Sequence, residues 1–393
     1  MRHDSNDNRD GLCTTHAKLD RGLLRVPRSP KLQEGEKQMR RSMLPVLLAL
    51  AGLTLVSAAP PPLSPPPSYY DNSRHPDAWA GGARKIMITT PKGPHQLWIK
   101  RVGNNPKLKL LLLTGGPGLS HAYLEVMDSF LPGAGIEYYH YDQLETGDSD
   151  RPDDDSLWTL ARYVDEVDQV RRAIGGDKSN FCVLGHSWGG VLAIEYALAH
   201  QDQLKCLVIS NMMASIPAYN AYARDVLEPK MDQKILRRIL DMEATGKTED
   251  PAYMALLQPN WYEQHILRRP SAEWPEPVER AGARLNRRFY VTMQGPSEMG
   301  ASGRLVNWDR FADLKRITVP TLVVSGAHDT MDPAYMARMA KQLPHGELLA
   351  TNGGHMAMYD DQPRYFAGLT RFMRKMNQTF SRGPSRGSVP PSR

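Results

Sequence analysis

The sequence predicts an α/β fold in which helices cover both faces of a mostly parallel sheet. Eight short runs rich in apolar and β-branched residues recur along the chain, each bounded by Gly, Pro, Asn or Asp. Stretches with apolar residues at helical spacing, such as 156–174 and 188–200, lie between them. Several runs are apolar without alternation, which is typical of parallel strands buried on both sides. Such strands need helices on each face of the sheet, so the pattern favours the α/β class.

The runs define the order of the expected elements. We expect strands at 85–90, 95–102, 109–114, 136–142, 181–185, 206–210, 321–326 and 347–351. Residues 212–310 are helix-like, rich in Met and Arg, and contain no clear strand. We therefore expect a core of residues 84–211 and 311–376, with a helical cap, 212–310, inserted between the sixth and seventh strands.

The two ends of the chain predict export and unstructured segments. In residues 39–59, Arg40 and Arg41 precede an apolar stretch that ends in Val56-Ser57-Ala58, which is the layout of a signal peptide. We expect the leader, 1–59, to direct export to the periplasm or the medium, with translation starting at Met39. A membrane anchor is the less favoured alternative, because the apolar stretch is too short for a stable span. Residues 60–83 predict a Pro-rich linker and 377–393 a disordered tail.

Composition excludes several classes of function. The net charge is +6, and ten Lys/Arg against six Asp/Glu in residues 1–58 supply most of it. No basic run with interleaved aromatics suggests nucleic-acid binding. Three cysteines are too few for a disulfide scaffold. Cys182 and Cys206 lie in strand-like runs, so we expect buried thiols, with a bridge as the alternative in an exported protein. No cluster has metal-ligand spacing, and we expect neither metal nor organic cofactor.

The segment Gly185-His186-Ser187-Trp188-Gly189 predicts a catalytic nucleophile. It follows a buried-strand candidate and precedes a helical run, the strand–turn–helix setting of a nucleophile elbow. Small flanking residues allow the tight turn that lifts the Ser187 hydroxyl above the sheet edge. The alternative is an incidental serine at a Gly-rich turn.

A serine nucleophile needs a general base and an acid that orients it. In the fold that carries such an elbow the chain order is Ser, then Asp or Glu, then His. Asp329 follows the seventh strand and His355 follows the eighth, so we expect them to complete a triad. The alternative for Asp329 is a cap of the helix that begins near Pro333, and the rival for the base is His328. Asp332 is better placed as a helix cap, and His328 adjoins Asp329 on the same loop.

Stabilising the oxyanion requires two backbone N–H donors. Trp188, directly after the nucleophile, is expected to supply one. The other is expected from the loop Thr114-Gly-Gly-Pro-Gly118, because it follows the third strand directly and its glycines permit close approach of the backbone.

Together these segments resemble the proline iminopeptidase (prolyl aminopeptidase) family of α/β-hydrolases. The motifs that carry the resemblance are TGGPG (114–118), YDQLETGDSD (141–150), GHSWGG (185–190), GAHDTMDP (326–333) and GGH (353–355). The cap adds WPEP (274–277) and MQGPSE (293–298). The likeness covers about residues 86–376, but only YDQL and the cap's GPSE point narrowly to this family.

The resemblance implies an α/β-hydrolase fold and a role for each matching residue. Ser187, Asp329 and His355 would form the triad, and Gly116 and Trp188 would supply the oxyanion donors. Glu298 would pair with the free amino group of a small peptide or amino-acid amide substrate, proline being favoured at the N-terminus. An exposed cap glutamate without a ligand is the alternative for Glu298.

Three positions depart from the family pattern. Thr114 replaces a histidine, Glu145 stands where many members have glycine, and Thr330 occupies the place of a second amine-binding glutamate. These departures leave room for a carboxylesterase, or another small acyl hydrolase, that does not recognise an amine. A catalytically silent binding protein is less favoured, because all three triad positions are filled.

Overall fold

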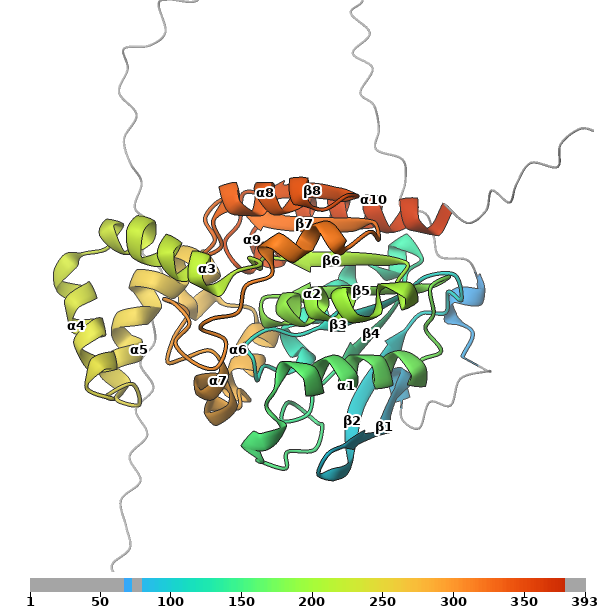
Figure 1. Ribbon diagram of the computed structural model, residues 1–393, viewed down its shortest axis with the longest axis horizontal. Helices are drawn as coiled ribbons and strands as arrows, with labels where there is room; N and C mark the ends of the chain where they lie inside the picture. The colour runs from blue at the N-terminus through green and yellow to red at the C-terminus, as the bar shows by residue number, and fades with distance from the viewer. Residues whose placement is uncertain (1–66, 73–79, 379–393) are drawn as a thin grey trace, which may run out of the picture. The chain divides into compact units, whose positions relative to one another are not determined.

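The computed structural model describes residues 67–72 and 80–378, and it confirms the α/β class (Figure 1). Its eight-stranded sheet has the order β1-β2-β4-β3-β5-β6-β7-β8, with β1 and β2 antiparallel to their neighbours and the other pairs parallel. The strands are β1 Ala83–Thr90, β2 Gly93–Val102, β3 Lys109–Leu113, β4 Glu137–Tyr141, β5 Phe181–His186, β6 Cys206–Ser210, β7 Thr321–Gly326 and β8 Gly346–Thr351. Every strand predicted from the sequence is present, with its ends within two residues.

Two hydrophobic layers flank the sheet, because alternate strand residues point to opposite faces. Leu111, Val183 and Ile209 pack on one face with α1 (Leu160–Ala173), α2 (Trp188–His200) and α8 (Pro333–Gln342). Leu112, Leu184 and Val208 pack on the other with the 3-10 helix η3 (His121–Ser129), α9 (Ala357–Asp360) and α10 (Gln362–Gln378). The central strands are therefore buried on both sides, as their unbroken apolar runs predict.

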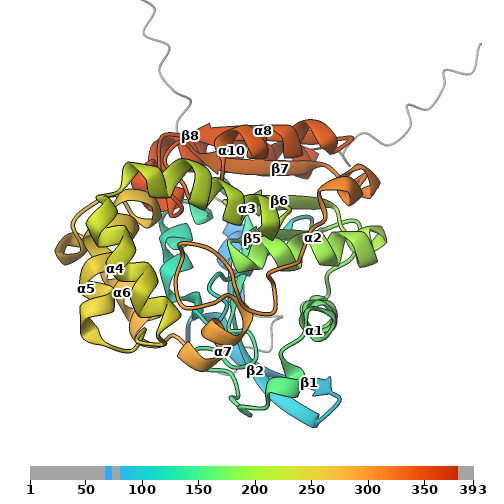
Figure 2. The same cartoon turned by 60° about the vertical axis from the view of Figure 1, so that its left-hand side comes forward.

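Between β6 and β7 the chain forms a helical layer, which corresponds to the expected cap (Figure 2). Its helices are α3 Ile216–Tyr222, α4 Gln233–Ala244, α5 Pro251–Leu257, α6 Glu276–Ala283 and α7 Arg287–Met293, with π-helical turns at Ala223–Leu227 and Gln258–Ile266. Leu236, Ile239 and Trp261 belong to a separate buried cluster within this layer. An isolated β-bridge between Ser215 and Asp309 joins the two ends of the insertion.

Part of the predicted linker packs against the core, which corrects the expectation for residues 60–83. A short 3-10 helix spans Pro67–Tyr70, and Tyr69 within it is buried. Its hydroxyl donates to the backbone oxygen of Ile136 at 2.8 Å. At the other end, α10 extends to Gln378, two residues into the predicted tail. Three ranges lie outside the described residues: 1–66, 73–79 and 379–393. They include the whole predicted leader, 1–59, most of the predicted linker and most of the predicted tail. No helix within the described ranges is both long and apolar enough to cross a membrane.

Cys182 and Cys206 form a disulfide, so the expectation of two free thiols is wrong. They are register partners on the adjacent parallel strands β5 and β6. Their Cα atoms are 4.7 Å apart, and both side chains are buried in the layer that faces α10. The sequence left this pairing open, because strand order and register decide it.

Candidate active site

Ser187 lies at the turn between β5 and α2, where the elbow motif predicts it. Its φ of 55° is in the left-handed region, which is uncommon for a residue with a side chain and marks a strained turn. A Cβ at Gly185 would meet the oxygen of Gly189 at 2.0 Å, and one at Gly189 would meet the oxygen of Leu113 at 2.2 Å. Both motif positions must therefore be glycine for this bend to form.

Asp329 and His355 are hydrogen-bonded to each other, and His355 lines the same cavity as Ser187. Asp329 follows β7 and His355 follows β8, and the His355 Nδ1 atom is 2.8 Å from Asp329 Oδ1. The second oxygen, Oδ2, accepts from the Asn211 side-chain amide at 2.7 Å. The His355 Nε2 atom is buried and has no partner within the described chain. Ser187 and His355 both line one cavity, and the unengaged Nε2 of His355 is the nitrogen that a general base would use.

The rival base His328 has no contact with Asp329 like that of His355, and Asp332 caps a helix as the sequence predicts. The backbone N–H of His328 donates to Gly353, and its backbone oxygen lies 2.9 Å from His265 Nδ1, while its side chain is exposed. Asp332 is the N-cap of α8 and accepts from the Ala334 backbone N–H at 2.9 Å. Neither lines the cavity that Ser187 and His355 share.

The pKa of His355 lies above its usual value. Burial acts to lower it, but the nearby charges of Asp329 and Glu298 and the hydrogen bond that the ring donates to Asp329 outweigh that effect. The imidazole is thus a stronger base than a free histidine, which suits proton abstraction from a serine.

The expected oxyanion loop lies against the elbow. Gly116 has a φ of +107°, which favours glycine, and it lines the cavity beside Ser187. Trp188 is the first residue of α2, where a backbone N–H has no partner within the helix. The Gln143 side chain, which the sequence did not single out, donates to Thr114 Oγ1 at 3.0 Å and accepts from Trp188 Nε1 at 2.9 Å. Gln143 therefore ties the loop to the elbow, and Thr114 takes part in that link in place of the family's histidine.

Glu298 lines the same cavity from the cap. Its Oε1 atom accepts a 2.6 Å hydrogen bond from the hydroxyl of Tyr290, on α7. Its backbone oxygen accepts from Tyr219 at 2.5 Å and from the Trp261 indole at 3.0 Å. Burial raises the pKa of the Glu298 carboxyl, against the lowering effects of His355 and Tyr290. A cation that enters the cavity would offset the desolvation of this carboxylate and favour its ionised form.

The cavity has a volume of about 440 Å³ and lies between the core and the cap. Its cap side is mostly apolar and includes Tyr262, Trp274, Val278, Ala281 and Leu285. An ion pair between Arg287 and Glu249, at 3.1 Å, stands among the lining residues. Within the described ranges no group of three or more His, Cys, Asp or Glu side chains could hold a metal ion.

None of the three departures from the family pattern lines this cavity. Glu145 is buried with a φ of 79°, and its carboxylate accepts from the Trp158 indole at 3.2 Å. Its backbone oxygen accepts from Asn286, just before α7, at 3.1 Å, so it joins core to cap. Thr330 is buried, and its hydroxyl donates to Asp329 Oδ1 at 3.3 Å. Thr330 therefore contacts the carboxylate of Asp329, whereas Glu298 lines the cavity that contains Ser187 and lies near Tyr290.

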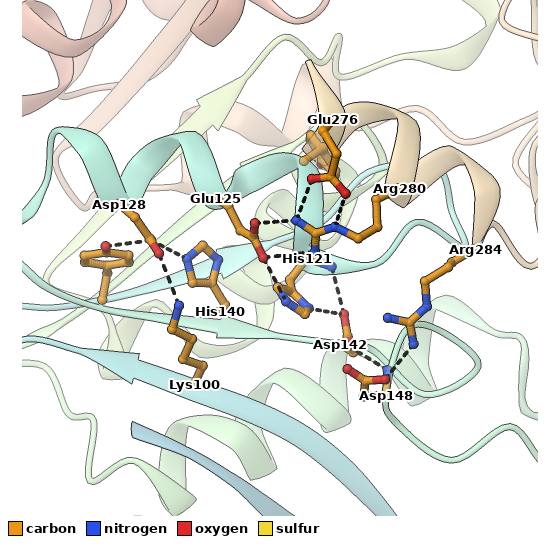
Figure 3. Close-up of polar contacts among 12 residues, drawn as sticks. Lys100, His121, Glu125, Asp128, His140, Asp142, Asp148, Glu276, Arg280 and Arg284 are labelled. Atoms are coloured by element: carbon orange, nitrogen blue, oxygen red, sulfur yellow. Dashed lines mark hydrogen bonds and ion pairs between the residues drawn. The ribbon is translucent and has the colours of Figure 1, made fainter. Parts of the chain in front are cut away.

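Polar contacts attach α6 of the cap to the core next to the oxyanion loop (Figure 3). Arg280 binds Glu125 of η3 at 2.6 Å, and Arg284 binds Asp148 at 2.6 Å. The His121 ring connects these groups, because its Nδ1 is 2.9 Å from Asp142 Oδ1 and its Nε2 is 3.6 Å from Glu125. Asp142, from the YDQ motif, also accepts from the backbone of His121 at 2.8 Å.

Sequence comparison relates the chain to hydrolases. A profile described as alpha/beta hydrolase fold matches residues 110–362. The proline iminopeptidase of Chitinophaga pinensis is 47% identical over 75% of this chain and 99% of its own length. That of Flavobacterium johnsoniae is 50% identical over 74% of this chain and 98% of its own length.

Comparison with solved structures points the same way. The crystal structure of VinJ covers 75% of this chain and 99% of its own, at 27% identity and a TM-score of 0.68. The proline iminopeptidase structure from Mycobacterium smegmatis covers the same shares at 26% identity, with a TM-score of 0.66. In each case nearly the whole of the solved chain is matched by the folded part of this one.

Proposed function

The chain belongs to the proline iminopeptidase family of α/β-hydrolases, and from this we propose that it releases N-terminal proline from short peptides and amino-acid amides through an acyl-enzyme. The observation that carries the proposal is the presence of Glu298 in the cavity that Ser187 and His355 line. An aminopeptidase must select a free, cationic terminus, and a mostly buried carboxylate does so.

In this mechanism each residue has one role. Ser187 Oγ attacks the scissile carbonyl while His355 Nε2 takes its proton and Asp329 holds Nδ1. The backbone N–H groups of Gly116 and Trp188 stabilise the oxyanion. His355 then gives the proton to the leaving amine as the C–N bond breaks, and the prolyl group remains as an ester on Ser187 Oγ. Water then attacks this ester while His355 takes its proton, and His355 returns the proton to Ser187 Oγ as free proline leaves.

Glu298 would hold the substrate by its amine. A prolyl terminus is a secondary ammonium with two N–H donors, and the carboxylate of Glu298 has acceptor capacity left beyond its bond to Tyr290. The same ion pair would fix the scissile carbonyl over Ser187. A substrate without a free amine would lose this positioning.

The test compares prolyl-naphthylamide, its N-acetylated form and a p-nitrophenyl ester. We expect the wild type to cleave the free amine much faster than the acetylated form. Glu298→Gln should reduce cleavage of the free amine at least tenfold and spare the ester, and Ser187→Ala should abolish all three activities. Glu249→Gln is the matched control, because that exposed carboxylate also lines the cavity and is paired with Arg287. Equal cleavage of free and acetylated substrates would favour the carboxylesterase alternative.

We also propose that the enzyme is exported, to the periplasm or the medium. Residues 39–59 have the layout of a signal peptide, and the Cys182–Cys206 disulfide is of a kind that persists in oxidising compartments. Terminal sequencing of protein recovered outside the cytoplasm should give a start close after Ala58. Recovery of the active protein only from the cytoplasm, with residues 39–58 retained, would contradict this.

A further inference from the structure

A continuous chain of hydrogen bonds runs beside Ser187, from the oxyanion loop to the backbone of His355. The backbone N–H of Gly115 donates to the hydroxyl oxygen of Tyr123 at 2.6 Å. That hydroxyl is 3.0 Å from His186 Nδ1, and His186 Nε2 is 2.9 Å from the backbone oxygen of His355. Gly115 and His355 lie 240 residues apart in the sequence. They are thus joined through His186, the residue that precedes the nucleophile.

The chemistry of its two ends fixes the direction of every bond in this chain. A backbone carbonyl can only accept, so His186 Nε2 must carry the proton that His355 receives. The Gly115 N–H can only donate, so the phenol oxygen accepts from it and gives its own proton to His186 Nδ1. This requires a neutral imidazole. Burial, reinforced by the charge of His355, lowers the pKa of His186 to about 3, which keeps the ring neutral.

Close packing makes the chain sensitive to displacement. Tyr123 and His186 are both buried. A Cβ placed on Gly115 would lie 2.9 Å from the Ser187 Cβ and 3.2 Å from the Tyr123 hydroxyl oxygen. The oxyanion loop therefore touches the elbow at this point, and a shift of Gly115 carries Gly116 with it. The polar atoms of both rings are used within the protein although the rings border the cavity.

We propose that Tyr123 and His186 are positioning residues that hold the oxyanion loop and the catalytic histidine in one fixed relation around Ser187. The proposal rests on the serine mechanism proposed above. Tyr123 would act through Gly115 on the N–H of Gly116, and His186 would act through the backbone of His355 on its ring. Loss of either link should raise the barrier to the transition state and leave substrate binding nearly unchanged, because neither group contacts the amine.

The first test is Tyr123→Phe, with Tyr359→Phe as its matched control. The Tyr359 hydroxyl donates to the backbone oxygen of Tyr123 at 3.0 Å, so its loss also removes a buried tyrosine hydrogen bond but leaves the chain intact. Removal of an oxyanion donor itself lowers kcat by about 100-fold or more, so we expect displacement of the loop to cost about tenfold. The KM of Tyr123→Phe should stay within about twofold of wild type, and Tyr359→Phe should keep kcat within the same range.

A second pair of variants tests whether a side chain that keeps the hydrogen bond to the His355 backbone oxygen also keeps activity. His186→Gln places an amide N–H near the former Nε2 and can still donate to His355, whereas His186→Leu cannot. We expect kcat to fall in the order wild type, Gln variant, Leu variant. Binding of a prolyl boronic acid, whose tetrahedral anion imitates the transition state, should weaken in the same order while KM stays level.

The outcomes separate this proposal from the proposed function. All rates are normalised to the fraction of enzyme that a fluorophosphonate labels at Ser187, and melting curves establish that each variant is folded. If Tyr123→Phe matches wild type in kcat and in boronate affinity, the positioning role is wrong while the aminopeptidase stands. If the wild type cleaves no prolyl substrate, the proposed function fails, and the rate of fluorophosphonate labelling then tests the positioning role, because that reaction needs no amine.

Discussion

At the scale of single residues, hydrogen bonding separates two carboxylates that lie near one histidine. Asp329 receives donors from His355, Asn211 and the backbone of Met331. Among the described residues, the Glu298 carboxylate accepts a hydrogen bond from the Tyr290 hydroxyl alone. The first carboxylate is fixed in place and can orient a ring, whereas the second keeps acceptor capacity for a ligand. This difference supports the separate roles that we propose for them.

The pH dependence of activity should report on both carboxylates. His355 must be neutral to accept the serine proton, and its pKa lies above the ordinary 6.5 partly because of Glu298. We expect the acidic limb of kcat/KM for a p-nitrophenyl ester to have its midpoint above pH 6.5. In Glu298→Gln one source of negative charge is gone, so this midpoint should move to lower pH. An unmoved midpoint would show that Glu298 does not influence the His355 ring.

His186 should make the protein sensitive to acid. Its pKa is about 3 in the folded state and about 6.5 when exposed, so the unfolded chain binds the extra proton between these values. The stabilisation is complete above pH 6.5 and is lost as pH falls towards 3, by up to ~1.4 kcal/mol per pH unit. Urea unfolding at pH 7 and pH 4.5 should show a smaller loss of free energy of unfolding for His186→Gln than for wild type. Equal losses would mean that other groups dominate the acid response.

The sequence could identify residues that belong to a contiguous motif and missed those that act across the fold. The elbow defines Ser187, and strand order places Asp329 and His355 after β7 and β8. Gln143 lies in the quoted YDQ motif, which was a usable signal. Tyr123 has no such signal, because its partner Gly115 is reached only when η3 packs beside β3. Tyr290 likewise has no sequence signal, since its contact with Glu298 depends on how α7 packs in the cap.

At the scale of elements, the docking of α6 on η3 connects the cap to the active site. Arg280 pairs with Glu125, and the Asp142 carboxylate below them also holds the start of η3. The same helix lines the cavity through Val278 and Ala281. A change in how α6 is held should therefore alter substrate binding more than chemistry.

Arg280→Met tests this docking. Both members of the Arg280–Glu125 pair are about one-third exposed, so solvent screening limits its contribution to about 1 kcal/mol or less. We expect KM for prolyl-naphthylamide to rise about two- to fivefold with little change in kcat. The KM of wild type should rise with added salt, whereas that of the variant should respond less. Arg224→Gln, which breaks an exposed ion pair elsewhere in the cap, should leave KM unchanged.

Strands were easier to predict than cap helices for a physical reason. Each strand is a short apolar run between turn residues, and burial on two faces leaves few alternatives. The cap helices are short, and two of them, α3 and α5, continue into π-helical turns at Ala223–Leu227 and Gln258–Ile266. Their ends depend on packing around Trp261 and on contacts with the core, which the sequence pattern does not reveal. The sequence therefore predicted a helical insertion at 212–310 but not its individual helices.

At the scale of the whole folded unit, the disulfide joins strands that both lead to the active site. Cys182 is the second residue of β5, which ends at the elbow, and Cys206 is the first residue of β6, which leads to Asn211. The bond lies at the opposite ends of these strands from Ser187. It should therefore contribute to the stability of the sheet and have little effect on the geometry of the site.

Reduction of this disulfide should lower stability without changing catalysis. The cysteines are 24 residues apart, and closing a loop of that size stabilises a protein by about 3 kcal/mol through the unfolded state. The free energy of unfolding in urea should be lower by about that amount when a reductant is present. The kcat of the folded, reduced enzyme should stay within about twofold of the oxidised value. The double variant Cys182→Ala/Cys206→Ala is the control, because reductant should have no effect on its unfolding. If thiol titration of the denatured, unreduced enzyme detects both cysteines as free, the bond does not form in the mature protein, and the support that it lends to export is lost.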